Sequence, residues 1–297
     1  MSNTKLRIFF FYAAFVLLLA AGCAGTKPLL QADRIPEAFV PAQHLVFIGL
    51  DGWGGAYVSK ADMPAAKRMM SMGASSLKLQ CVMPSKSWPN WTALFTGSPS
   101  EDNSLKDNPS LFTVTANAGS GKNKTAFFYE WKELRRICPD GKTEKYIIAS
   151  DLESAEKAAA YIGENKPFFT AVVFNEPDSV GHNKRWGSSA YYNKLTELDS
   201  YIAIIEQAVK DAGIYDSTVF VLSADHGGVF WGHGFNSPKQ RRIPLIVYGR
   251  GIKKGVIASP AGICDITPTM ATILGLEAPP EWIGQTLYGI FENDIEP

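Results

Sequence analysis

The sequence lacks any excess of charge of either sign. Its 297 residues include 29 Lys plus Arg and 29 Asp plus Glu, so the formal net charge is zero at pH 7. A chain without net charge has no strong overall field that would attract polyanions or an anionic membrane surface. We therefore expect no binding to nucleic acid duplexes, and recognition of any phosphate group has to be local.

Cysteine is scarce, and its spacing excludes one class of metal site. The four cysteines are Cys23, Cys81, Cys138 and Cys264, and none of them forms a C-x-x-C pair. Without such pairs, a zinc site built from thiolates is not expected. A disulfide between Cys81 and Cys138 and a set of three buried thiols are both compatible with this spacing.

Long apolar runs are absent except near the N-terminus. Residues 8–21 are apolar, follow Lys5 and Arg7, and precede Gly22-Cys23-Ala24-Gly25. The run is too short for a comfortable membrane span, and the arrangement is typical of a signal peptide. Its end resembles a bacterial lipobox, in which Cys23 is lipidated and becomes the first mature residue. An ordinary cleaved signal peptide and an uncleaved anchor are the alternatives.

These features predict three segments. Residues 1–22 are expected to be a signal peptide of the lipoprotein type, residues 23–43 a tether, and residues 44–297 one catalytic α/β domain. The protein would then be an exported lipoprotein of the bacterial cell envelope. Its membrane contact would be made only through the N-terminal lipid on Cys23.

The remaining chain alternates between apolar runs and helical patterns. Runs typical of strands covered on both faces occur at residues 44–50, 76–82, 125–129, 168–174, 218–222 and 244–248. Helical patterns lie at residues 63–72, 91–96, 152–162, 190–212 and 266–274. The alternation predicts an α/β fold with a mostly parallel central sheet flanked by helices on both faces. Residues 97–124 are rich in Ser, Asn, Gly and Lys, and we expect a long surface excursion there.

Three aspartates and three histidines form the main chemical signal. Asp51, Asp178 and Asp225 each stand just after a strand run, and the carboxyl ends of parallel strands meet at one crevice. The histidines share short motifs with two of these aspartates and are His182, His226 and His233. Carboxylates and imidazoles of this number are sufficient for two zinc ions. The fourth histidine, His44, begins a strand at the far side and is expected to be structural.

A hydroxyl-rich turn supplies a nucleophile. Ser87 precedes Trp-Pro-Asn and a helical pattern, so we expect it just before a helix N-terminus, where backbone N–H groups favour an anion. A zinc ion on its oxygen would favour the alkoxide, which makes Ser87 the predicted nucleophile and Ser85 the competing choice. Asn90 is predicted to donate its amide to a phosphoryl oxygen in the transition state. A cap or turn role for Asn90 is the alternative.

Together these motifs resemble the alkaline phosphatase superfamily, and within it the nucleotide pyrophosphatase/phosphodiesterase (type I phosphodiesterase) branch. The matching stretches are residues 50–52, 84–97, 176–182, 224–227, 232–234, 244–252 and 265–276. The resemblance implies an alkaline-phosphatase-like fold with one zinc on Asp178, His182 and His233. It implies a second zinc on Asp51, Asp225, His226 and the Ser87 oxygen. It also implies in-line attack and a phosphorylated or nucleotidylated serine, which water then hydrolyses.

The predicted activity is therefore hydrolysis of phosphodiester or pyrophosphate bonds in a small phosphate ester. A phosphomonoesterase is the main alternative, with Lys86 or Arg185 in the place of the Arg that grips a phosphate dianion. A phosphoryl transferase would use the same residues with an alcohol acceptor. A sulfatase would need an Arg where Trp91 stands, and a binding lipoprotein without catalysis would be expected to have lost a ligand.

Five tryptophans lie near the motifs. Most of them should pack in the core, and one could stack on a substrate ring. They are Trp53, Trp88, Trp91, Trp186 and Trp231.

Overall fold

The computed structural model describes residues 28–292, apart from residues 30–31, 33, 100–107, 119–122, 139–142 and 258–259. The predicted signal peptide and Cys23 lie outside these ranges, and both stay predictions. Within the described part, no helix combines the length and the apolar character that crossing a membrane requires.

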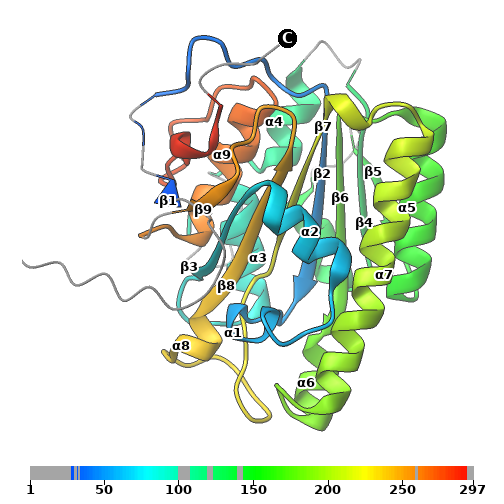
Figure 1. Cartoon of the computed structure of the whole chain (residues 1–297), viewed down its shortest axis with the longest axis vertical. Helices are drawn as coiled ribbons and strands as arrows, with labels where there is room; N and C mark the ends of the chain where they lie inside the picture. Colours follow the sequence, from blue (N-terminus) through cyan, green and yellow to red (C-terminus); the bar gives the residue numbers. More distant parts are fainter. Residues whose placement is uncertain are drawn as a thin grey trace, which may run out of the picture.

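One sheet organises the described part of the chain (Figure 1), with the strand order β1-β9-β3-β8-β7-β2-β6-β4-β5. Strand β8 runs antiparallel to its neighbours β3 and β7, and the other described pairings are parallel. The predicted mostly parallel sheet is thus confirmed. The strands are β1 (Pro28–Leu29), β2 (His44–Asp51), β3 (Ala74–Gln80), β4 (Thr125–Tyr129), β5 (Glu144–Ile147), β6 (Phe169–Pro177), β7 (Thr218–Ser223), β8 (Arg242–Gly249) and β9 (Gly255–Ile257).

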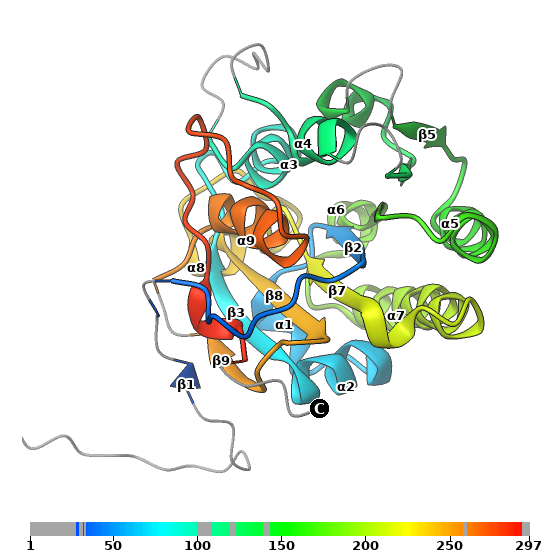
Figure 2. The ribbon, with the colours of Figure 1, turned by 90° about the horizontal axis from the view of Figure 1, so that it is seen from above.

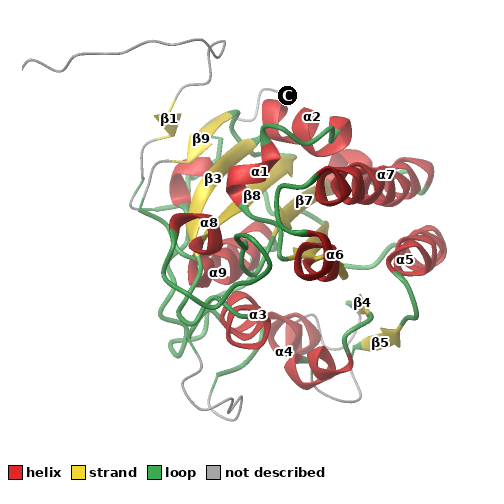
Figure 3. Cartoon of the chain, turned by 90° about the horizontal axis from the view of Figure 1, so that it is seen from below, coloured by secondary structure: helices red, strands yellow, loops and turns green. Residues whose placement is uncertain are grey.

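Helices cover both faces of the sheet, as predicted. Figure 2 shows α2 (Pro64–Met72) and α7 (Ser189–Asp211) on one face, with α5 (Asp151–Asn165) beside α7. The other face carries α3 (Ser87–Thr96), α4 (Leu111–Asn117) and α9 (Ile266–Ile273). Three short helices, α1 (Gly55–Val58), α6 (Asp178–Lys184) and α8 (Pro238–Arg241), lie at the end of the sheet to which β2 points (Figure 3).

The central strand β2 is apolar because it has no exposed side. It pairs with β6 and β7, and every residue after His44 is buried, which is the pattern of a parallel strand covered on both faces. Gly49 lets α3 approach closely, since a Cβ there would lie 2.5 Å from the Trp91 ring.

Two segments differ from expectation. Residues 111–117 of the predicted surface excursion form α4, whose Phe112 ring packs on Phe95 and Phe127 in the core. The Ser110 hydroxyl caps this helix by accepting a hydrogen bond from Thr113 N. Part of the predicted tether also packs on the domain, because Pro28–Leu29 pairs with β9 and the Phe39 ring lies 4.6 Å from that of Phe291. Within the described residues, Cys81, Cys138 and Cys264 form no disulfide with one another.

Candidate active site

The three aspartates meet at one edge of the sheet because β7, β2 and β6 are neighbours. Asp51 is the last residue of β2, Asp178 follows the end of β6, and Asp225 follows β7 by two residues. The carboxyl ends of parallel neighbours face the same crevice. The predicted convergence of these carboxylates is therefore present in the structure.

Asp178, His182 and His233 form the first group. Asp178 and His182 are four residues apart on α6, a spacing that places both side chains on one helix face, with Asp178 Oδ2 3.4 Å from His182 Nε2. His233 comes from the loop after β7, and its Nε2 lies 3.6 Å from Asp178 Oδ1 and 3.0 Å from His182 Nε2. Ligand atoms of all three residues lie within 4.8 Å of one another.

Asp51, Asp225, His226 and Ser87 form the second group. His226 Nε2 lies 3.6 Å from Asp51 Oδ1 and 3.3 Å from Asp225 Oδ2. The Ser87 hydroxyl lies 3.3 Å from Asp51 Oδ1 and 3.2 Å from His226 Nε2. Asp178 joins the two groups, because its carboxylate also lies within 4.8 Å of ligand atoms of Asp51 and His226.

The histidine rings present nitrogen lone pairs to the carboxylates. In His182, His226 and His233 the Nδ1 atom donates to a backbone carbonyl, at 2.9, 3.0 and 2.8 Å. A carbonyl only accepts, so Nδ1 carries the hydrogen and Nε2 is the free lone pair. Burial lowers the pKa values of His226 and His233, which keeps both rings neutral. The Nε2 atoms of His182 and His233 face each other at 3.0 Å, an arrangement that a shared cation would satisfy.

Within the described part of the chain, Asp51, Asp178 and Asp225 have no Lys or Arg partner, and their ion-pair contacts are with histidines. Burial, followed by the negative charge of Asp51 and Glu176, raises the pKa of Asp178 to about 8. Burial and nearby Asp178 raise the pKa of Asp225 to about 8, and burial with Asp225 raises that of Asp51. Asp178 Oδ1 and Asp225 Oδ2 are buried and have no hydrogen-bond partner among the residues that the structure describes. Buried acidic oxygens and neutral imidazoles together fit divalent cations, and zinc accepts both donor types.

The two serines of the turn differ in what they contact. Ser87 is the first residue of α3, and its hydroxyl faces the second group. The Ser85 hydroxyl is buried, donates to Phe235 O at 3.0 Å and accepts from Gly234 N at 3.0 Å. Only the Ser87 hydroxyl of this pair is thus directed at the clustered carboxylates.

Known proteins share this arrangement of sequence and fold. Residues 45–126 and 120–231 match the family described as type I phosphodiesterase / nucleotide pyrophosphatase, over more than half of the chain. The chain belongs to this family.

Relatives of the chain include larger proteins. GPI ethanolamine phosphate transferase 1 of Emericella nidulans is 32% identical over 165 residues, which cover 48% of this chain and 18% of that protein. Ectonucleotide pyrophosphatase/phosphodiesterase family member 1 of Rattus norvegicus is 24% identical over 230 residues, which cover 67% of this chain and 25% of that protein. The chain thus spans less than a third of the length of either relative.

A solved structure shows the same fold. Murine ectonucleotide pyrophosphatase/phosphodiesterase 5, determined as an inactive form in complex with AMP, superposes with a TM-score of 0.67 at 13% identity. The superposition covers 80% of this chain and 96% of that chain. The alkaline-phosphatase-like fold implied by the motifs is thereby confirmed.

In this member of the type I phosphodiesterase family, the Asn90 side chain holds the turn before α3 through hydrogen bonds to its backbone. Its Oδ1 accepts from Val82 N at 2.7 Å, and its Nδ2 donates to Pro84 O at 3.1 Å and Lys86 O at 3.0 Å. The amide is buried and directed at the backbone of the turn. These contacts support the alternative turn role, and donation to a phosphoryl group would require them to break.

The positioning roles of several residues around the aspartates were not predicted from the sequence. Gly52 has a φ of +73°, donates to Asp225 Oδ1 at 3.0 Å, and would place a Cβ 2.9 Å from Asp178 Oδ1. Its carbonyl accepts from Trp186 Nε1 and Tyr191 Oη. Trp91 is buried, as expected of core packing, and also donates to Asp51 Oδ2 at 2.9 Å. The signal that could have identified Gly52 is a glycine directly after an aspartate at the end of a predicted strand.

Proposed function

We propose that the chain is a zinc-dependent hydrolase of phosphodiester or pyrophosphate bonds, with Ser87 as its covalent nucleophile. The observation that carries the proposal is the position of the Ser87 hydroxyl. It lies at the start of α3 and within 3.3 Å of both Asp51 and His226. Family membership supports the reaction class.

The N-terminus of α3 would bind the phosphoryl group of the substrate. Its first backbone N–H groups and the helix dipole favour a phosphoryl group beside Ser87. Ser87 Oγ would attack phosphorus in line, forming an Oγ–P bond while the bond to the leaving alcohol or phosphate breaks. Water would then attack the same phosphorus atom, which releases the product and restores the Ser87 hydroxyl.

Two zinc ions would complete the site. We propose that Asp178, His182 and His233 hold one, and that Asp51, Asp225, His226 and Ser87 hold the other. Such ions would favour the serine alkoxide and balance charge on the entering and leaving oxygens. The His182–Trp231, His226–Gly227 and His233–Ser85 hydrogen bonds would fix each ring for binding through Nε2.

A phosphoryl transferase is the second candidate function. The observation that favours it is the 32% identity with GPI ethanolamine phosphate transferase 1 over 48% of the chain. The same phosphoserine would form, and an alcohol rather than water would then accept the phosphoryl group. A phosphomonoesterase would differ in carrying a cation that grips the phosphate dianion.

The test compares hydrolysis of a nitrophenyl phosphodiester and the matching monoester by the full chain, with zinc and after chelation. We expect preference for the diester and loss of activity on chelation. Monoester preference would favour the phosphatase alternative, and activity that survives chelation would contradict the metal requirement. Transfer to an added alcohol in place of hydrolysis would favour the transferase.

A further inference from the structure

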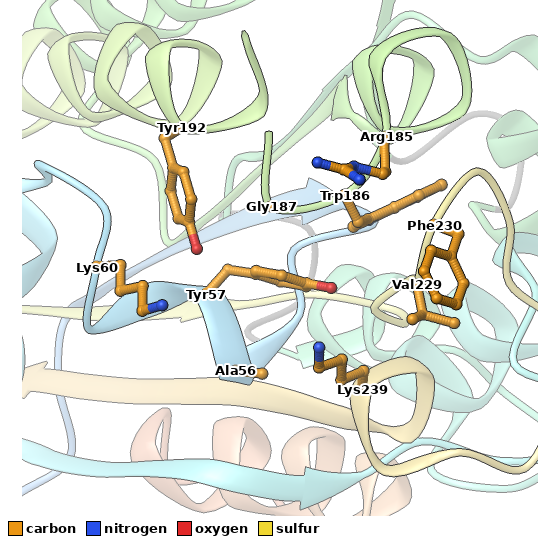
Figure 4. A pocket seen from close by; sticks show the side chains of 10 residues that line it. All are labelled: Ala56, Tyr57, Lys60, Arg185, Trp186, Gly187, Tyr192, Val229, Phe230 and Lys239. Atoms are coloured by element: carbon orange, nitrogen blue, oxygen red, sulfur yellow. The ribbon is translucent and has the colours of Figure 1, made fainter. Parts of the chain in front are cut away.

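A cavity is lined by Trp186 and nine other residues (Figure 4). Its volume is about 370 Å³, within the range of small-molecule sites of roughly 300–1,000 Å³. Three parts of the chain surround it: α1 with the turn that follows, the connection between α6 and α7 with the start of α7, and the loop that leads into α8 with α8 itself. These parts come from distant positions in the sequence, so the cavity belongs to the tertiary fold.

The lining is cationic. Lys60, Arg185 and Lys239 reach the cavity from three different elements, and no Asp or Glu lines it. Within the described part of the chain, these three side chains have no hydrogen-bond or ion-pair partner. Other basic side chains are paired, as Lys157 is with Glu153 and Lys194 with Glu197. Exposed lysines are ordinarily solvated, but three unpaired cations around one concavity favour an anionic ligand.

The backbone of two lining residues is strained. Arg185 has a φ of 77° and Phe230 a φ of 53°, and the other described non-glycine residue with positive φ, Lys166, ends α5. Side chains other than glycine rarely adopt this region. Such strain persists where the surroundings impose it and clusters at functional sites. Here Trp186 N donates to Phe230 O at 2.8 Å, which ties the two strained positions together.

Aromatic rings form much of the remaining wall. The rings are those of Tyr57, Trp186, Tyr192 and Phe230. The Tyr57 hydroxyl is already used, since it donates to Gly228 O at 2.8 Å. The wall therefore offers ring faces and edges, which suit a planar group. Trp186 is shared with the first metal-ligand group, because its ring lies 5.0 Å from that of His182 and 5.9 Å from that of His233.

We propose that this cavity is a second binding site for a phosphorylated small molecule that carries a planar ring, of the nucleotide class. The phosphate would lie among Lys60, Arg185 and Lys239, and the ring against the aromatic wall. The site uses none of the predicted metal ligands. It therefore goes beyond the proposed hydrolytic function and does not depend on it.

The test is isothermal titration of AMP into the full chain carrying Asp225→Asn and treated with a chelator, so that the metal-ligand groups are impaired while the residues of the cavity are unchanged. We expect this variant still to bind AMP. Adding Arg185→Ala or Lys239→Ala should weaken binding about tenfold each, the loss expected for one charge-assisted contact. Lys184→Ala is the matched control, because Lys184 is exposed and adjacent to Arg185 in sequence but does not line the cavity.

A further variant separates binding from folding. Arg185→Gly should weaken AMP binding as Arg185→Ala does, while its melting temperature stays at or above that of the parent because glycine relaxes the positive φ. Loss of all AMP binding in Asp225→Asn alone, or equal affinity in Arg185→Ala and Lys184→Ala, would overturn the proposal. Failure of the hydrolysis test would leave both of these results unchanged.

Discussion

Ser87 and Ser85 show how two residues in one turn take different tasks. The Ser85 hydroxyl donates to Phe235 O, accepts from Gly234 N and is fully buried. The Ser87 hydroxyl instead points at Asp51 and His226. A nucleophile needs an accessible oxygen beside activating groups, and Ser87 meets this condition.

Ser87→Ala should lower kcat for diester hydrolysis by about 10³-fold or more, the scale of removing a covalent nucleophile. Zinc content should be largely retained, since six other ligand side chains are present. The control is Ser85→Ala, which should cost about 1–3 kcal/mol of unfolding free energy through its lost buried hydrogen bonds. Comparable kcat in Ser87→Ala and the parent chain would exclude the covalent mechanism.

The aspartate and histidine ligands give a second residue-level prediction. Asp225→Asn and His182→Ala should each reduce bound zinc, because each removes one ligand atom from one of the two groups. His44→Ala is the matched control, since His44 bonds Pro167 O at 2.7 Å at the opposite end of β2. Elemental analysis after dialysis provides the measurement. Equal zinc content in His182→Ala and His44→Ala would show that the ligands are wrongly assigned.

Helix α3 and the turn before it depend on one amide. Asn90 links helix α3 to Val82, Pro84 and Lys86 through buried hydrogen bonds. Asn90→Ala should lower the unfolding free energy by about 2–3 kcal/mol, because buried backbone groups lose their partners. Asn183→Ala, which removes an exposed bond to Ser179 O, should cost little. Urea denaturation compares them, and equal midpoints would contradict the assigned role.

Helix α5 is joined to the end of β6 through Asp151. Its carboxylate accepts from Asn175 N at 2.8 Å and Glu176 N at 3.1 Å, just before Asp178. Burial is the largest cause that raises its pKa from 3.8 to about 7, and the charges of Glu130 and Glu176 add to it. The side chain thus binds a proton more tightly in the folded chain than in the unfolded one.

This proton affinity predicts a pH dependence. The stabilising contribution of Asp151 is complete below its unfolded pKa of 3.8 and is lost as pH rises through about 7. Between these values, the unfolding free energy of the parent should fall relative to that of Asp151→Asn. The limiting slope is about 1.4 kcal/mol per pH unit. Chemical denaturation across this range measures the difference, and parallel curves would contradict the raised pKa.

Across the whole molecule, the sequence predicts the centre of the sheet better than its edges. The central strands β2, β6 and β7 are continuous apolar runs, because both of their faces are covered. Edge strand β5 and the short strands β1 and β9 have no such run. The antiparallel direction of β8 depends on long-range pairing with β3 and β7, which local patterns do not encode.

In the candidate site, too, the sequence predicts some features and not others. The ligand positions are predictable because they stand at strand ends or in glycine-rich motifs. The contacts of Trp91 with Asp51 and of Trp186 with Gly52 are not, since each joins residues at least 40 positions apart. The turn role of Asn90 also depends on which backbone groups surround it, and a single sequence does not give that information.

Trapping the covalent intermediate would test directly whether Ser87 is the nucleophile. The zinc-loaded chain is mixed with a phosphodiester substrate, quenched in acid within the first turnover, and digested for peptide mass spectrometry. We expect a phosphoryl or nucleotidyl group on Ser87, which is absent after chelation and in Ser87→Ala. Turnover of the substrate with the adduct on another residue, or with none during a measured burst, would contradict it.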